Sequence, residues 1–239
     1  MRIGAPAYFS PSIAPDEWAR LERLPAGSIS IVNPDSGPAA GMSAEYGSAV
    51  RAVRRRGALV YGYIDLAYGA KGNGRVLRAA AAYRRQLGLD GVFLDQAPHS
   101  PSGLAPSRRL SWALRGLGLR TAINPGRALD DHAVARWFDE VVVFEGHWSD
   151  YRRLPVDFLS AADARRWHLV YGVPEAHTSE AVARARRHGA GVLYVTDGDM
   201  PNPWFRLPAA WTSLIGLAGV PARPALRAVR PASILLSEP

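Results

Sequence analysis

The sequence predicts a single (β/α)8 barrel, in which eight parallel strands alternate with helices. Short apolar runs rich in valine, isoleucine and tyrosine recur eight times along the 239 residues, and amphipathic stretches lie between them. The chain is also long enough to bury a core of that size. A doubly wound open sheet is the alternative, because it uses the same alternation of strand and helix.

Each predicted strand is an apolar run that ends at a polar or glycine-rich segment. The strands are expected near residues 3–8, 28–33, 58–65, 91–95, 120–124, 140–145, 168–173 and 191–196. Helices are expected over the stretches PDEWARLERL, SAEYGSAVRAVRRRG, GRVLRAAAAYRRQLG, SRRLSWALRGLG and SEAVARARRHG. Several of these open on Asp, Ser or Pro and close on Gly, as helix start and stop signals do. Residues 151–167 fit a helix least well.

The domain organisation follows from the end of this pattern. We assign residues 1–218 to the barrel, and residues 219–239, which are rich in proline, arginine and alanine, to an extended tail. No apolar run approaches the roughly 18 residues of a membrane span, so a membrane is not an expected partner. The N-terminus has no long apolar segment of the signal-peptide kind, which favours a cytoplasmic location.

Composition excludes several classes of site. Cysteine is absent, so a disulfide framework, a thiolate metal site and a thiol nucleophile are all excluded. The net charge of +8 comes from arginine, because Lys71 is the single lysine. Arginine clusters lie late in predicted helices, where cations meet the negative end of the helix dipole. A nucleic-acid surface is therefore the weaker interpretation of the charge.

The residue that closes each strand is expected to face the active site, because barrel active sites lie at the carboxyl ends of the strands. The strand ends supply Tyr8, Asn33, Asp65, Asp95, Asn124, Glu145, either Tyr171 or Val173, and Asp197. An Asn or Asp after a strand also suits a turn or a helix cap, so each one alone is ambiguous. Several carboxylates on one rim are a stronger indication of chemistry.

Asp95 and Glu145 are the candidate catalytic pair. Two carboxylates that flank a bond are the minimal machinery of glycoside hydrolysis, and these two close the fourth and sixth strands. Glu145 follows four apolar residues, and burial raises a carboxyl pKa toward that of a working acid. We expect Glu145 to donate the proton and Asp95 to act as nucleophile or charge stabiliser, with Asp65 in support.

Aromatic and polar side chains in the same loops suit a sugar site, since ring faces stack on the C–H surfaces of sugars. The expected substrate-binding residues are Tyr8, Asn33, Tyr68, Gln96, Asn124, Trp148, Tyr171, Asp197 and Trp204. The six histidines show no HxH or HExxH spacing, and although Asp197 and Asp199 have a spacing that two metal ligands use, a metal is not favoured. No cofactor is expected.

Several segments together resemble the spherulin-4 family, whose barrels are grouped with glycoside hydrolase family 135. These segments are PAYFSP, IVNPDSGPA, VYGYIDLAYG, LDGVFLDQ and VVVFEG, in the family's order over residues 6–146. The resemblance implies a (β/α)8 fold and endo-type hydrolysis of α-1,4-linked N-acetylgalactosamine or galactosamine polymers. It also implies that the acids of the fourth and sixth strands are Asp95 and Glu145.

Gln96 departs from the family pattern, which usually has a second acid directly after the first. An amide cannot act as a carboxylate nucleophile or donate a proton at pH 7. Three functions therefore stay open: a glycoside hydrolase-like enzyme acting on an amino-sugar glycoside, a repurposed barrel that catalyses a non-hydrolytic step on a small metabolite in a cytoplasmic biosynthetic pathway, and a catalytically disabled carbohydrate-binding barrel. The expected partner is a carbohydrate or small glycoside, and the oligomeric state is open.

Overall fold

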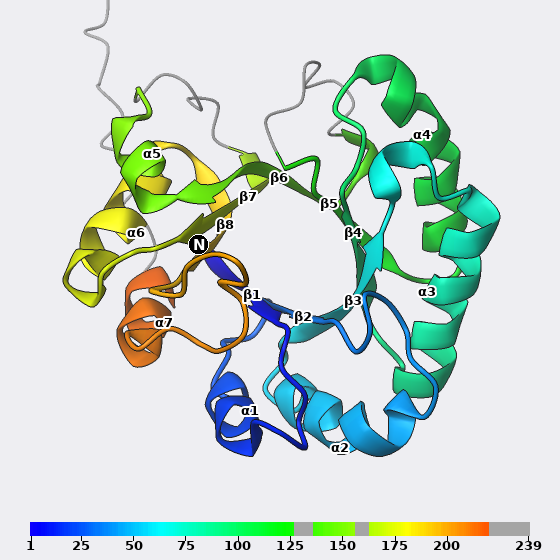
Figure 1. Cartoon of the computed structure of the whole chain (residues 1–239), viewed down its shortest axis with the longest axis horizontal. Coiled ribbons are helices and arrows are strands. Elements are labelled where there is room, and N and C mark those ends of the chain that lie inside the picture. The colour runs from blue at the N-terminus through cyan, green and yellow to red at the C-terminus, as the bar shows by residue number, and fades with distance from the viewer. Residues whose placement is uncertain (127–135, 156–162, 220–239) are drawn as a thin grey trace, which may run out of the picture.

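The computed structural model describes residues 1–126, 136–155 and 163–219 of the chain. Its eight strands form one closed parallel barrel in sequence order, with β8 paired to β1. The helices surround this barrel on the outside (Figure 1). The closed barrel confirms the fold expected from the sequence and excludes the open sheet.

The observed strands match the eight apolar runs. They are β1 Arg2–Ala7, β2 Ile29–Val32, β3 Leu59–Asp65, β4 Gly91–Asp95, β5 Arg120–Ile123, β6 Glu140–His147, β7 Asp163–Tyr171 and β8 Ala190–Val195. β6 ends later and β7 begins earlier than predicted. The additional residues at these two ends are mostly polar, so a search for apolar runs finds only the buried part of each strand.

The described helices are α1 Pro15–Leu21, α2 Met42–Arg54, α3 Asn73–Leu87, α4 Pro101–Gly116, α5 Trp148–Arg153, α6 Thr178–Arg187 and α7 Trp211–Gly219, with short 3-10 turns η1 Ala67–Gly69 and η4 Glu175–His177. Five of these helices, α1 to α4 and α6, match the five predicted stretches, and α5 overlaps only the start of residues 151–167. α4 starts before the predicted 107 because Ser100 caps it, its hydroxyl accepting from the Gly103 N–H at 3.2 Å. In the described part of the chain, no helix is both long and apolar enough to cross a bilayer.

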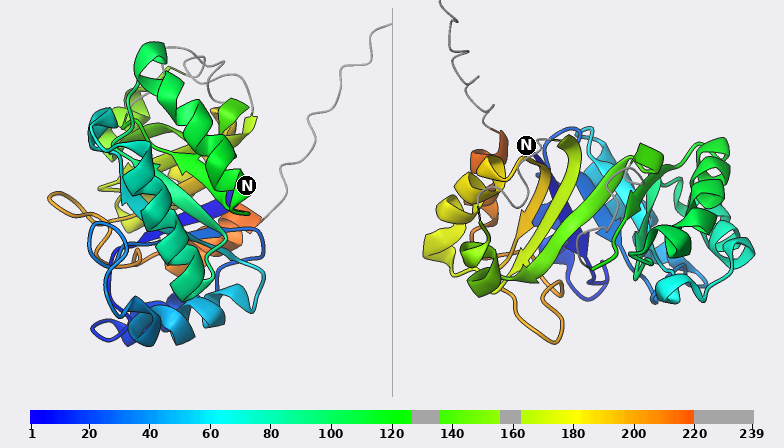
Figure 2. Two further views of the ribbon diagram at one scale, coloured as in Figure 1. Left: turned by 90° about the vertical axis from the view of Figure 1, so that its right-hand side faces the viewer. Right: turned by 90° about the horizontal axis from the view of Figure 1, so that it is seen from above.

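α7 was not predicted, and it ends the described part of the barrel domain. The predicted tail falls almost wholly on residues 220–239, which lie outside the described residues. The views in Figure 2 show α3 and α4 side by side on one flank of the barrel.

Large rings fill the barrel where small residues make room for them. A Cβ added to Gly4 in β1 would lie 2.1 Å from the ring of Trp167 in β7. Trp167 in turn packs edge-on against Phe93 of β4, with ring centroids 5.4 Å apart. The interior is therefore a packed core and not a channel.

A buried ion cluster lies at the starts of the strands. Glu140 is fully buried, and its Oε1 accepts from Arg2 at 2.9 Å and from Arg120 at 3.0 Å. The Tyr61 hydroxyl donates to Glu140 Oε2 at 3.0 Å. These contacts join β1, β3, β5 and β6 at one end of the barrel, so the opposite end, where the strands finish, is the end available for a site.

Candidate active site

Asp95, Asn124 and Glu145 meet at the ends of three consecutive strands, β4, β5 and β6. The Asn124 Nδ2 group donates to Asp95 Oδ1 at 2.7 Å and to Glu145 Oε2 at 2.6 Å. The Gly126 N–H donates to Asn124 Oδ1 at 2.9 Å, which fixes the orientation of the amide. Both hydrogens of one amide nitrogen are thus used to hold two carboxylates together.

The shared nitrogen limits the distance between the two carboxylates. Asp95 Oδ1 and Glu145 Oε2 can be no farther apart than the sum of their distances to Asn124 Nδ2. This upper limit is smaller than the roughly 6.5 to 9.5 Å that separates the carboxyl groups of inverting glycosidases, and it is compatible with the about 5 to 5.5 Å of retaining ones. The geometry therefore suits a nucleophile and an acid facing the same bond.

Asp95 has further hydrogen-bond donors. The Tyr63 hydroxyl donates to Asp95 Oδ2 at 2.8 Å, and the Gln96 backbone N–H also donates to the carboxylate. Tyr8 packs edge-on against Tyr63, with ring centroids 5.5 Å apart. Burial, followed by the nearby charge of Asp95, raises the pKa of Tyr8, so this hydroxyl stays protonated beside the pair.

The two carboxylates have different protonation behaviour. Burial raises the pKa of Glu145 to about 7; the hydrogen bond from Asn124 opposes this rise, and the charge of Asp95 adds to it. Burial also raises the pKa of Asp95, but hydrogen bonds from Tyr63, Gln96 and Asn124 oppose the rise. Asp95 has the more extensive stabilisation of its charge, and Glu145 is the group that carries a proton near neutral pH.

Two loops beside Asp95 are joined through their backbones. The Tyr68 N–H donates to the Gln96 carbonyl at 2.7 Å, and Asp65 Oδ1 accepts from the Ala67 N–H at 2.6 Å. Ala67, Tyr68 and Gln96 have φ values of 46°, 52° and 48°, in the left-handed region that residues with a Cβ seldom adopt. Such strain clusters at functional sites. The Asp65 carboxylate thus stabilises the loop that follows β3. Gln96 contacts Tyr68 and Asp95 through its backbone carbonyl and N–H.

The side chains of Asn33 and Asp197 bond to other groups of the loops in which they lie. Asn33 Oδ1 accepts from the Gly37 N–H at 3.1 Å. Asp197 pairs with Arg206 at 2.8 Å and accepts from the Ala209 N–H at 3.1 Å. Burial raises the pKa of Asp197, but the hydrogen bonds from Arg206 and the Ala209 N–H, together with the charge of Arg206, outweigh burial, and the pKa is lowered. In the described ranges, no group of three or more His, Cys, Asp or Glu side chains is placed to hold a metal ion.

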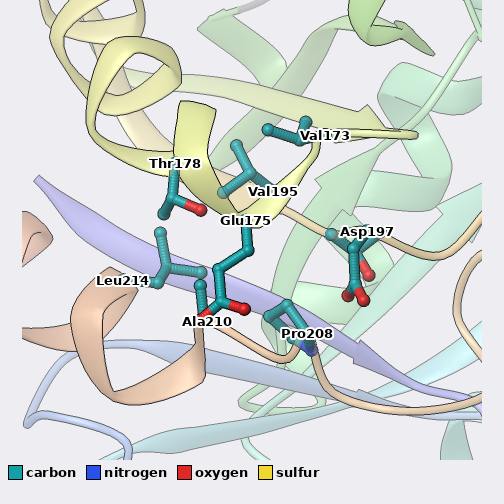
Figure 3. A pocket seen from close by; sticks show the side chains of 9 residues that line it. Val173, Glu175, Thr178, Val195, Asp197, Pro208, Ala210 and Leu214 are labelled. Atoms are coloured by element: carbon teal, nitrogen blue, oxygen red, sulfur yellow. The ribbon is translucent and has the colours of Figure 1, made fainter.

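Asp197 also borders a pocket, whose lining is shown in Figure 3. The pocket is bordered by the ends of β7 and β8 and by α6 and α7. Its lining consists of Val173, Glu175, Thr178, Val195, Thr196, Asp197, Pro208, Ala210 and Leu214. Neither Asp95 nor Glu145 belongs to this lining, so we do not place the reaction there.

Tyr171 and Trp204 form an aromatic cluster with His147, a residue that the sequence did not single out. Ring centroids are 6.2 Å apart for Tyr171 and Trp204, and 5.7 Å for Tyr171 and His147. His147 lies two residues after Glu145 in β6 and therefore on the same strand face. Its Nδ1 accepts from the Ser149 N–H at 3.1 Å, so in the neutral ring the proton is on Nε2.

Trp148 and Tyr68, which were also predicted to bind substrate, lie outside this cluster. Trp148 is buried and packs on Tyr151 with ring centroids 6.2 Å apart, which makes it a core residue. Tyr68 is 68% exposed on the loop after β3. The structure thus leaves Tyr68 accessible to a ligand and buries Trp148.

Tyr63 is the main contact of the pair that sequence reasoning missed. It lies two residues before Asp65 in GYIDLAYG, so its side chain shares the strand face of that rim residue. This periodicity was the available signal. Within an apolar run, however, a tyrosine is indistinguishable from core.

Comparison with known proteins places the chain in a family. The family model described as spherulation-specific family 4 matches residues 2–218. Spherulin-4 of Physarum polycephalum is 24% identical in an alignment of 212 positions, and the match covers 83% of this chain and 64% of that protein. The chain therefore spans less than two thirds of the relative's length.

Two solved structures share the barrel. Aspergillus clavatus Sph3, crystallised in complex with GalNAc, has a TM-score of 0.76 at 19% identity, over 91% of this chain and 96% of that one. Active domain 2 of a Pyrococcus furiosus chitinase has a TM-score of 0.54 at 14% identity, over 92% of this chain and 97% of that one. These likenesses show the common fold. The match over nearly the whole sequence shows more: the chain belongs to the spherulation-specific family 4.

Proposed function

We propose that this protein hydrolyses a glycoside of an amino sugar of the galactosamine or N-acetylgalactosamine type. The observation that carries the proposal is the pairing of Asp95 and Glu145 through the one amide of Asn124. Membership of the family and the GalNAc bound by the Aspergillus structure support the choice of sugar.

The pair divides the chemistry between its members. Glu145 donates its proton to the glycosidic oxygen while Asp95 attacks the anomeric carbon, so the C–O bond to the leaving sugar breaks and a glycosyl ester forms on Asp95. Glu145, now ionised, takes a proton from water, and the resulting hydroxide equivalent displaces Asp95. Tyr63 and Asn124 orient Asp95 throughout, because each donates to a different oxygen of its carboxylate.

Two aromatic side chains are proposed to bind the sugar. Tyr8 lies beside the pair, and Tyr171 packs against the buried Trp204, which supports its ring from behind. Ring faces suit the C–H surfaces of pyranoses. Tyr68, exposed on the loop after β3, is proposed to contact a neighbouring sugar unit.

The proposal is tested by incubating the protein with α-1,4-linked N-acetylgalactosamine and galactosamine oligomers and measuring the new reducing ends. Chitin oligomers serve as the comparison substrate.

The pH dependence of this hydrolysis follows from Glu145. Its pKa is raised to about 7 by burial, and the acid step needs the protonated form. We therefore expect kcat/KM to fall about tenfold per pH unit above roughly pH 7. On the acid side the rate falls as Asp95 is protonated, and the two limbs report the coupled pair. A rate that stays constant from pH 6 to 9 would exclude Glu145 as the acid.

A carbohydrate-binding barrel without hydrolysis is the second candidate, and Gln96 is the observation that favours it. Under our proposal residue 96 contributes only its backbone groups. The new carboxylate in Gln96→Glu would then act only by shifting the pKa values of Asp95 and Glu145. We therefore expect Gln96→Glu to change kcat by less than about tenfold. If the unaltered protein binds the oligomers without cleaving them and Gln96→Glu cleaves, the disabled barrel is correct. Isothermal calorimetry and the reducing-end assay on both proteins distinguish the two.

A further inference from the structure

One flank of the molecule is rich in arginine. α3 and α4 lie side by side there (Figure 2, left), and neither contains an aspartate or a glutamate. Their arginines are all exposed: Arg75, Arg78, Arg84 and Arg85 on α3, and Arg108, Arg109 and Arg115 on α4. We call this surface the basic flank.

Helix dipoles account for only part of the charge of the basic flank, because within this set Arg84, Arg85 and Arg115 are the ones in the last turns of their helices. Arg75 and Arg78 lie in the first two turns of α3, where the positive end of the dipole disfavours cations. Arg108 and Arg109 lie in the middle of α4. Over the described part of the chain, Arg115 is the one of this set with a carboxylate at ion-pair distance, Asp139 at 3.8 Å. The fold thus leaves most of this charge available.

The same flank exposes apolar side chains. Trp112 is 54% exposed and Leu117 is 36% exposed, at the end of α4. The other large exposed hydrophobic residues of the described ranges, Ile13, Tyr68, Met200 and Phe205, lie on loops that follow strands. The Arg108 guanidinium lies 4.6 Å from the ring centroid of Trp112. Cationic and apolar groups therefore alternate on the exposed side of α4.

We propose that the basic flank docks on the surface of an anionic lipid bilayer. Guanidinium groups pair with the phosphates of acidic headgroups, and exposed tryptophan and leucine side chains reach the boundary between headgroups and acyl chains. Leu117 favours lipid over a nucleic acid, because only the bilayer offers it an apolar environment. No spanning helix is needed for such peripheral attachment, which is independent of the proposed reaction.

Vesicle sedimentation of the full chain tests this docking. The protein should bind vesicles that contain phosphatidylglycerol, should not bind pure phosphatidylcholine, and should dissociate as salt is raised. Each charge removed should weaken binding about fivefold, so Arg75→Glu, Arg78→Glu and Arg109→Glu together should weaken it at least a hundredfold. Trp112→Ala should weaken it several-fold without changing the salt dependence.

The matched control changes the same number of charges elsewhere. Arg23→Glu, Arg153→Glu and Arg187→Glu together alter exposed arginines outside the basic flank and should leave most of the binding in place. Unchanged thermal midpoints would show that both triple variants are folded. Equal loss of binding in the two, no binding of the unaltered protein to phosphatidylglycerol, or tighter binding of duplex DNA through the same arginines would each overturn the proposal.

Discussion

Asp95→Asn and Glu145→Gln are each expected to lower kcat for galactosaminide hydrolysis by a factor of about 10³ or more, because each removes one of the two groups that act on the bond. Both amides keep the size of the side chain. Asn124 can still donate to the remaining carbonyl oxygen in each variant, so binding of the oligomer should change much less than kcat. Reducing-end assays and calorimetry measure the two quantities separately.

Asp16→Asn is the matched control for these variants. Asp16 is exposed in the first turn of α1, and its replacement should leave kcat unchanged. Turnover by either Asp95→Asn or Glu145→Gln at the rate of the unaltered enzyme would remove the carboxylate pair from the reaction, even if the protein proved to be a hydrolase.

Glu140→Gln is expected to destabilise the fold by about 1.5 to 3 kcal/mol, a sizeable part of the stability of a typical domain, since Arg2 and Arg120 are partly exposed and water replaces some of the lost interaction. Glu140 is fully buried and its carboxylate accepts from both Arg2 and Arg120. The neutral amide leaves these two guanidinium groups without the charge that compensates them. Urea unfolding of the variant and the unaltered protein measures the difference in the free energy of unfolding.

Two further variants make this stability test specific. Tyr61→Phe removes a hydroxyl that bonds to Glu140 and Arg120, and should cost about 1 to 3 kcal/mol while keeping the ion pairs. Glu22→Gln breaks a surface pair with Arg55 at 3.8 Å and should cost no more than about 1 kcal/mol. Equal losses for Glu140→Gln and Glu22→Gln would mean that the buried cluster contributes no special stability.

The fold was predictable because the pattern repeats. Each strand of this barrel is buried on both faces, so it appears in the sequence as an apolar run, and eight such runs specify the architecture. Strand ends were less accurate where polar residues continue the sheet, as at His147 of β6. α7 was missed because it is short and lies next to a proline- and arginine-rich segment.

The candidate site was predictable only in part. Strand ends identified Asp95, Asn124 and Glu145, which do meet in space. The same rule also selected Asp197, whose carboxylate pairs with an arginine nine residues later in a loop of irregular conformation. The periodicity of a sequence predicts strands and helices but not side-chain contacts within an irregular loop. Roles within the site depend on side-chain hydrogen bonds, and these come from the structure.

The anomeric configuration of the first product tests the account most directly. Asn124 holds Asp95 and Glu145 closer together than the carboxylates of an inverting pair, so ¹H NMR during hydrolysis of an α-1,4-linked N-acetylgalactosamine oligomer should first show the α-anomer at the new reducing end. The β-anomer should then appear by mutarotation. Initial formation of the β-anomer, or no cleavage at all by the unaltered protein, would contradict the proposed role of the pair.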